Sequence, residues 1–513
     1  MMNHSRTQNI ILNSIFGIAA SFVTVVLNFF VRVFIVKELG EEINGLQSLF
    51  YSITNVMLLM EMGISSAIVI HLYDPVAKQD KEAIASIMAF YKKTYNILAI
   101  AFTLISFIVT FTLLDHFVTS SIPTKQIRIF FILFTSSFTI NYLTYYKRSL
   151  LFAEQKNRIS ITVTALCEIV FRGCQIIFLT IFHQYVIFLL LIIAEKITSN
   201  FICNKYVSIH HPYLDDNPKP IDEYKKKSIY ATIKPLMVNQ TANTVQQSAG
   251  NVLISILLGN ISIVGYYGTY HLFMSVVQLI YSQFGGAFTT SFGNLAVEKD
   301  LCKMRRGYFK SAFIMNWMAA LFCAGFLTCT SDLIYIVFGA NFVLKIENVM
   351  IITMSMMVYL LNIPIISIQN ALGLHRLDAV KMIIQTVLAI FLGYVGGRFL
   401  GMPGILGGLL LPMIIFSTIA KGIIICKHAL CVSARQYLGF IFKEIVKIVV
   451  VCIICHFLCV YMRLTPSIPS IIIKVTICVI VAISIPYLLS IHTTELAETM
   501  DLFKMIINKK SSK

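Results

Sequence analysis

The chain has 513 residues, of which 57% are hydrophobic and 13% are charged, and its mean hydropathy is +0.80. Soluble globular proteins carry about 25% charged residues, so this composition excludes a soluble protein and indicates a polytopic membrane protein. The net charge of +17 would suggest nucleic-acid binding in a soluble chain, but here the positions of the basic residues explain it without a nucleic-acid partner.

About fourteen apolar segments follow one another along the chain, and a helix needs roughly 20 such residues to cross a bilayer. Their expected bounds are 10–36, 46–71, 95–114, 127–146, 159–181, 185–204, 235–258, 263–288, 308–330, 348–370, 378–399, 403–425, 441–461 and 470–490. With a cytoplasmic N-terminus, about three quarters of the 41 lysines and arginines, Lys147 and Arg148 among them, fall in or beside cytoplasmic loops. We therefore expect both termini in the cytoplasm.

The first apolar segment carries a stripe of polar and small residues. Its members follow at steps of three or four and so share one helix face: Asn13, Gly17, Ser21, Thr24, Asn28 and Arg32. Lipid cannot solvate this face, and an arginine within the membrane is costly unless it faces a cavity or a partner. The stripe predicts one wall of an aqueous cavity in a transporter. Arg32 is the best candidate to bind an anionic substrate, because guanidinium binds phosphate in a bidentate manner; the alternative is that it extends to the membrane surface. Asn28, on the same stripe, is a further candidate substrate-binding residue.

An internal repeat with an offset of about 220 residues indicates two similar halves. Leu39-Gly40 with Gly45 recurs as Leu258-Gly259 with Gly265, and the turn at 153–156 is echoed at 373–376. The predicted division is an N-lobe at 1–207, a cytoplasmic linker at 208–228, a C-lobe at 229–426, and two appended helices with a basic tail at 427–513.

The first two helices expected in the C-lobe also carry polar faces. The candidate substrate-binding residues there are Asn239, Asn243, Gln246 and Gln278. Matched polar stripes favour a hydrated cavity, although such side chains also serve as hydrogen-bonding contacts between helices.

The intramembrane ionisable residues expected from the sequence are these six: Arg32, Glu61, Glu168, Arg172, Glu195 and Lys196. Glu168 and Arg172 are four apart, a spacing that permits an ion pair on one helix. Glu195 and Lys196 are adjacent, so we expect them to need separate partners. Glu61, which alternatively pairs with Arg32, and His271 are candidates to carry a coupling proton or cation.

Over nearly its whole length the chain resembles the polysaccharide-transporter branch of the MOP (multidrug/oligosaccharidyl-lipid/polysaccharide) superfamily. These are the flippases for lipid-linked O-antigen, capsule or exopolysaccharide repeat units. The resemblance rests on the opening helix, on FIVKELGEEINGLQSLFYSITNVMLLMEMGISSAI (Phe34–Ile68), on the basic loop after it, on LLFAEQKNR (Leu150–Arg158) and on the repeat.

The resemblance implies a V-shaped pair of six-helix lobes around a central cationic cavity in the bacterial cytoplasmic membrane. It implies alternating access that moves an undecaprenyl-diphosphate-linked oligosaccharide from the cytoplasmic to the outer leaflet, in partnership with a polysaccharide polymerase and chain-length machinery. Cavity arginines in such flippases hold the diphosphate. Arg32 matches that role, and Arg172 and Lys196 are further candidates.

Two other functions compete with this one. A cation-coupled drug antiporter of the same superfamily would have a carboxylate-rich cavity, whereas the lobe faces here are rich in Asn, Gln and Ser. A membrane polysaccharide polymerase or ligase would need a sizeable soluble loop with catalytic groups, and the sequence offers short external loops and no nucleophile constellation. Cys452, Cys455 and Cys459 share a helix face but are better explained as apolar packing residues than as metal ligands. We therefore expect no catalytic residues, no metal site and no cofactor other than a coupling H⁺ or Na⁺.

Overall fold

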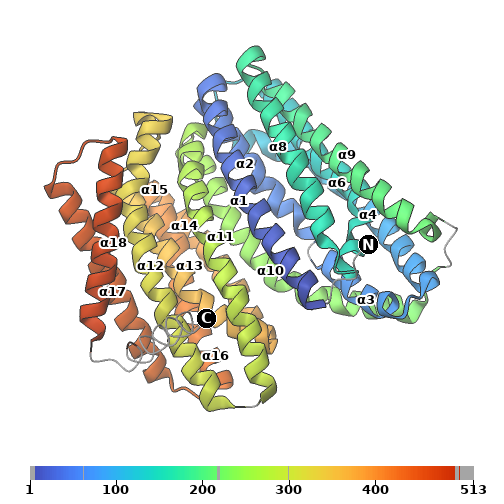
Figure 1. The fold of residues 1–513 in the computed structure, drawn as a ribbon. Helices are drawn as coiled ribbons and strands as arrows, with labels where there is room; N and C mark the ends of the chain where they lie inside the picture. The colour runs from blue at the N-terminus through green and yellow to red at the C-terminus, as the bar shows by residue number, and fades with distance from the viewer. Residues whose placement is uncertain (1–5, 62, 216–219, 299, 492–495, 497–513) are drawn as a thin grey trace, which may run out of the picture. The chain divides into compact units, whose positions relative to one another are not determined.

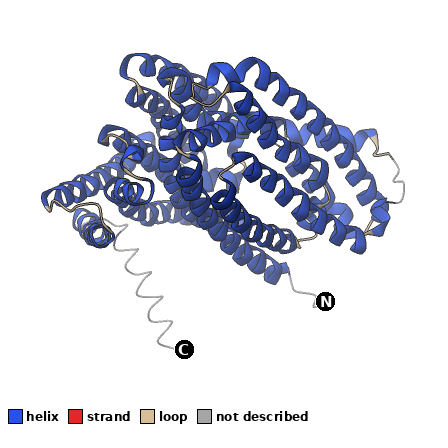
Figure 2. Cartoon of the chain, turned by 90° about the horizontal axis from the view of Figure 1, so that it is seen from above, coloured by secondary structure: helices blue, strands red, loops and turns tan. Residues whose placement is uncertain are grey.

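The computed structural model describes residues 6–61, 63–215, 220–298, 300–491 and 496. Within these ranges nearly every residue is helical and no strand occurs (Figure 2). Ten helical segments of the described chain are long and apolar enough to cross a membrane. The protein is therefore an all-helical, multi-pass membrane protein, while the count of fourteen spans stays a prediction.

The chain divides into two compact units, residues 1–265 and 266–513. The first contains α1 to α10 and the first turn of α11, and the second contains the rest of the chain (Figure 1). The lobe boundaries expected from the sequence stay a prediction.

The helices of the first unit have these bounds: α1 (Arg6–Leu39), α2 (Glu41–Met57), α3 (Ile64–Lys78), α4 (Lys81–Ile108), α5 (Leu114–Phe117), α6 (Thr124–Tyr145), α7 (Arg148–Ala153), α8 (Asn157–Phe182), α9 (Tyr185–His210), α10 (Glu223–Leu258) and the start of α11 (Ile261–Glu298). Helix α1 packs on α8, α9 packs on both α6 and α8, and α4 packs on α6. Aromatic contacts also join α2 to α6, where Phe50 lies against Phe131 and Phe134.

The second apolar segment is not one helix, contrary to the span expected at 46–71. Helix α2 ends at Met57, a single 3₁₀ turn covers Leu58–Met60, and α3 begins at Ile64. Gly63 adopts a left-handed backbone with φ +89°, which glycine accepts at little cost and which interrupts a right-handed helix. Glu61 therefore lies at a break in the helix and not in the middle of a span.

The helices of the second unit have these bounds: the rest of α11, α12 (Leu301–Phe338), α13 (Ile346–Leu372), α14 (Ala379–Leu400), α15 (Met402–Pro412), α16 (Lys421–Leu430), α17 (Ala434–Tyr461) and α18 (Ile468–Ser490). A π-helical stretch, Met413–Ala420, joins α15 to α16. Helix α12 contacts α13, α17 and α18, so the last two helices of the described chain pack on it (Figure 1).

Glycines allow α14 and α15 to pack in backbone contact. A Cβ atom added at Gly404 would lie 2.0 Å from the carbonyl oxygen of Gly396, and one added at Gly408 would lie 2.4 Å from the nitrogen of Gly393. Small residues at four-residue spacing permit such close helix pairs in membranes.

Candidate functional site

A polar cluster surrounds Arg32, near the end of α1. Its Nε donates to Oδ1 of Asn44 at 2.7 Å, and its Nη2 donates to Oγ of Ser48 at 2.5 Å. Asn44 and Ser48 lie on the first turns of α2, which can fold back on α1 because Gly40 separates the two helices with φ +90°. The partly buried guanidinium lies within the candidate span Ala19–Leu39, and its partners include an amide and a hydroxyl.

The cluster extends from α2 to α10 and to the first turn of α11. Asn44 is fully buried, and its Nδ2 donates to the backbone oxygen of Gly265 at 3.2 Å. Asn251 of α10 donates to Oγ of Ser52 at 2.8 Å. Arg32 is thereby connected through Asn44 to a backbone carbonyl on another helix.

At the same place α2 and α11 cross with their backbones in contact. A Cβ at Gly45 would lie 2.0 Å from the carbonyl oxygen of Ile261, and one at Gly265 would lie 2.9 Å from the nitrogen of Gly45. These two glycines are the pair that the sequence repeat makes equivalent. Only glycine at both positions permits this approach, so the crossing depends on the repeated motif.

A carboxylate anchors the end of this cluster. Glu42, at the start of α2, accepts hydrogen bonds from Oγ of Ser120 at 2.5 Å and from the backbone nitrogen of Ser121 at 3.0 Å. Burial acts to raise the pKa of Glu42, but these hydrogen bonds to the charged form outweigh it and lower the pKa below its usual value. The same loop contacts α11, because the nitrogen of Ile261 donates to the oxygen of Thr119 at 3.3 Å.

The asparagines and glutamines expected to bind substrate lie on α1, α10 and α11. Asn28 lies one turn before Arg32 on α1, and Gln246 lies on α10; both are partly buried. The side chains of Asn239 and Asn243 lie outside the described part of the structure. Gln278 is on α11 in the second unit and is partly buried.

Arg172 and Lys196 each have a partner on their own helix. Arg172 is buried and donates to Oε1 of Gln175 at 2.9 Å, and Lys196 pairs with Oε1 of Glu195 at 3.0 Å. The expectation that Glu195 and Lys196 need separate partners was wrong, because the long lysine chain reaches back to its neighbour.

The expected pair of Glu168 with Arg172 does not form within the described chain. Glu168 instead accepts a hydrogen bond from Oγ1 of Thr24 on α1, at 2.5 Å. This contact ties the polar stripe of α1 to α8, which an argument from spacing within one helix could not predict.

The two candidate coupling residues are both hydrogen-bonded to tyrosines. Glu61 accepts from Oη of Tyr95 at 2.5 Å, at the break between α2 and α3. His271, in the second unit, places Nε2 2.7 Å from Oη of Tyr267.

Several buried charges were not recognised in the sequence. Arg148, assigned there to a cytoplasmic loop, is 3% exposed and donates to Thr164 and Ser199. In the second unit three ion pairs are largely buried: Lys421–Asp378, Lys447–Glu444 and Lys474–Asp332. The partners of Lys421 and Lys474 come from distant parts of the chain, so only tertiary structure reveals these two pairs, whereas Glu444 and Lys447 lie three residues apart on α17.

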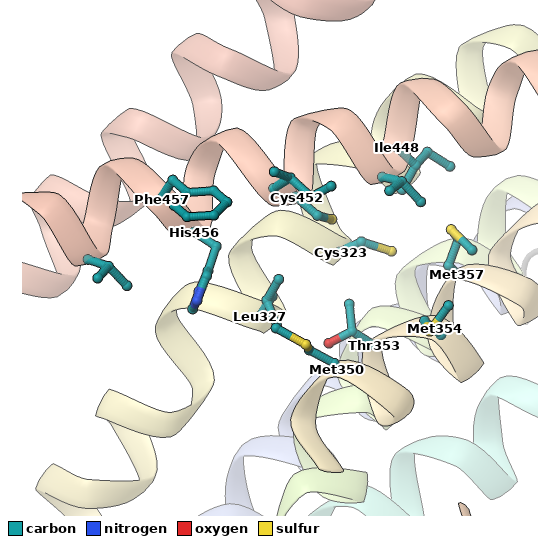
Figure 3. A pocket seen from close by; sticks show the side chains of 13 residues that line it. Cys323, Leu327, Met350, Thr353, Met354, Met357, Ile448, Cys452, His456 and Phe457 are labelled. Atoms are coloured by element: carbon teal, nitrogen blue, oxygen red, sulfur yellow. The ribbon is translucent and has the colours of Figure 1, made fainter. Parts of the chain in front are cut away.

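An apolar cavity of about 380 Å³ lies between α12, α13 and α17 in the second unit (Figure 3). Its lining is aliphatic, aromatic and sulfur-containing, and its polar side chains are Thr353 and His456. The sulfur-containing residues in the lining are Cys323, Met350, Met354, Met357 and Cys452. In a membrane protein such a cavity suits a hydrocarbon chain better than a polar solute. Among the described residues no group of three His, Cys, Asp or Glu side chains is placed to hold a metal ion.

Comparison with solved structures identifies the class of protein that this fold defines. An inward-facing multidrug-resistance MATE family transporter of the MOP superfamily matches with a TM-score of 0.65 at 11% identity, over 81% of this chain and 95% of that chain. A MOP superfamily transporter from Pyrococcus furiosus matches with a TM-score of 0.54 at 12% identity, over 82% and 96%. The chain therefore shares the fold of these MOP superfamily transporters, and these structural neighbours are transporters, not enzymes.

Within that class, the chain is also similar to a flippase. The lipid II flippase MurJ, in an inward closed conformation, matches with a TM-score of 0.66 at 16% identity, over 94% of this chain and 99% of that chain. No protein-family model matches the sequence. No curated protein matches it either.

Proposed function

We propose that the protein is a flippase that moves undecaprenyl-diphosphate-linked oligosaccharide repeat units across the bacterial cytoplasmic membrane by alternating access, for surface polysaccharide synthesis. The observation that carries the proposal is the position of Arg32. Its guanidinium lies within a membrane span, at the end of the polar stripe of α1, and is oriented by Asn44 and Ser48. A planar, fixed guanidinium is suited to bidentate contact with a phosphate group.

Two further features support a lipid-linked substrate. The cavity between α12, α13 and α17 offers an apolar surface for part of a lipid chain. The likeness to the lipid II flippase covers 94% of the chain, whereas that to the inward-facing MATE transporter covers 81%. Amide and hydroxyl groups near Arg32 are the partners that sugar hydroxyls and phosphate oxygens require.

The proposal is tested in the native host. Deletion should cause diphosphate-linked repeat units to accumulate and surface polysaccharide to be lost. Arg32→Ala should fail to restore the polysaccharide although the variant reaches the membrane in normal amount. Arg398→Ala removes an exposed arginine at the end of α14 and should restore it fully. Normal polysaccharide in cells carrying Arg32→Ala would refute the role of Arg32.

A cation-coupled drug antiporter is the alternative, favoured by Glu61, a carboxylate that lies at a helix break beside Tyr95. It predicts that the deletion leaves polysaccharide unchanged and makes the cells sensitive to cationic dyes. A Glu61→Gln variant would then reach the membrane but fail to restore dye resistance.

A further inference from the structure

We propose that anion binding at Arg32 releases the crossing of α2 with α11, because the anion and Asn44 compete for the same guanidinium. The inference rests on the proposed function and adds to it a link between substrate binding and a conformational change. Its basis is the chain of hydrogen bonds from Arg32 to Asn44 and from Asn44 to Gly265.

The guanidinium already uses its Nε–Nη2 edge, one of the two edges at which a guanidinium can hold a phosphate. Nε is bonded to Asn44 and Nη2 to Ser48, and a bidentate phosphate contact uses two neighbouring N–H groups of the guanidinium fork. A phosphate that binds Nε and Nη2 must therefore displace both side chains.

Displacement of Asn44 weakens the contact between α2 and α11. The amide is fully buried, and its Nδ2 holds the carbonyl of Gly265, next to the backbone contact of Gly45 with Ile261. An amide that loses its Arg32 partner has a buried Oδ1 without a hydrogen bond, so the buried position of Asn44 becomes costly. The amide regains a partner when the crossing opens to water.

Ser48 provides a way to separate the competition for Arg32 from the opening of the crossing. Its hydroxyl accepts from Arg32 and also contacts the backbone oxygen of Asn44, at 3.0 Å within its own helix. Ser48 makes no hydrogen bond to α11 within the described structure. Loss of this hydroxyl should relieve the competition for Arg32 without opening the crossing.

Anion binding at Arg32 and opening of the crossing must affect each other by equal amounts. If an anion at Arg32 favours the open crossing, then opening must favour the anion by the same factor. Asn44→Ala removes the competitor and loosens the crossing, so it should raise the affinity for a diphosphate by about tenfold, the size of one charge-assisted hydrogen bond. General damage to the fold would lower this affinity instead.

The experiment uses the full-length protein in lipid nanodiscs with farnesyl diphosphate as the probe and farnesol as its uncharged counterpart. Binding and hydrogen exchange are measured on the same sample, at segments 41–57 and 259–265. We expect the diphosphate, and not farnesol, to increase exchange at both segments. Asn44→Ala should show raised exchange without ligand and tighter binding, and Ser48→Ala tighter binding with exchange as in the unsubstituted protein.

Asn204→Ala is the matched control, since Asn204 also donates its amide to a backbone oxygen of another helix, that of Thr144 at 2.8 Å. It should change neither binding at Arg32 nor exchange at the crossing. Diphosphate binding without a change in exchange, together with no gain in affinity for Asn44→Ala, would overturn the proposed link and leave the flippase proposal standing. Absence of diphosphate binding in every variant would overturn both.

Discussion

Substitution of Gly45 by alanine tests the crossing of α2 with α11 most directly. The added Cβ would lie 2.0 Å from the carbonyl oxygen of Ile261, whereas ordinary contact begins at 3.4 Å. The atom in the way is backbone and not the end of a flexible side chain, so the two helices must separate by about 1.4 Å. The substitution therefore forces part of the opening that we propose for the transport cycle.

The magnitude follows from two opposing effects. Overpacking of this kind costs about 1–3 kcal/mol, while alanine in place of glycine within a helix gains about 0.5–1 kcal/mol. Gly173, within α8, is a matched control because a Cβ there would meet nothing within 4 Å. Gly173→Ala should therefore be stabilising, and the difference between the two variants should isolate the overpacking cost of about 1–3 kcal/mol.

Thermal unfolding in nanodiscs measures this difference, with both variants heated at the same rate because unfolding of such proteins is commonly irreversible. Gly45→Ala should unfold at a lower temperature than Gly173→Ala and should show raised hydrogen exchange at 259–265. Equal midpoints for the two variants, with unchanged exchange, would refute the close backbone contact.

Two further predictions concern buried charges. Lys474→Ala leaves Asp332 largely buried without its 2.5 Å partner and should lower the free energy of unfolding by about 3–5 kcal/mol. In thermal unfolding, the double variant Lys474→Met with Asp332→Leu should recover most of that stability. A double variant as unstable as Lys474→Ala would contradict this prediction. Burial acts to raise the pKa of Glu154, but hydrogen bonds from His211 and Lys156 outweigh it and lower the pKa. The stabilisation of the folded state by ionised Glu154 is therefore present above the pKa of this carboxyl in the unfolded state, and it is lost as pH falls through its pKa in the folded state. Glu154→Gln should lower the unfolding midpoint at neutral pH, with the gap closing in acid, and a gap that does not depend on pH would argue against the role of this carboxylate.

The positions of the helices could be predicted from the sequence because a membrane helix is recognised by high hydropathy over some 20 residues. The segment at 185–204, for example, is contained in α9, Tyr185–His210. The break after Met57 was missed, because Gly63 interrupts a run whose hydropathy is continuous. Hydropathy reports the solvent of a segment and says little about the backbone angle of one glycine.

The polar stripe on α1 could also be predicted from the sequence, because it requires only the period of a helix. The partners of its members were not. Thr24 binds Glu168 and Arg32 binds Asn44, across 144 and 12 residues of chain. Periodicity gives the face of a helix on which a side chain lies, whereas a hydrogen bond also depends on which helix is opposite.

Charge position was the least dependable signal. The positive-inside rule treats each Lys or Arg near an apolar segment as a loop residue, and Arg148 satisfies that description in the sequence. Its burial against hydroxyls of α8 and α9 follows from α7, a six-residue helix too short for a hydropathy window to detect.

The repeated glycines connect sequence to mechanism more closely than any single charge does. Gly40 and Gly259 both adopt a positive φ at the ends of α1 and α10, and the glycines that follow them, Gly45 and Gly265, pack against each other. Residues made equivalent by a repeat contact each other only where the two copies of the motif meet face to face. Each copy then supplies half of the same crossing, so a side chain at either glycine must separate the same pair of backbones. The proposed release by Arg32 acts on a contact that neither copy could form alone, and Gly265→Ala should reproduce the unfolding and exchange changes of Gly45→Ala.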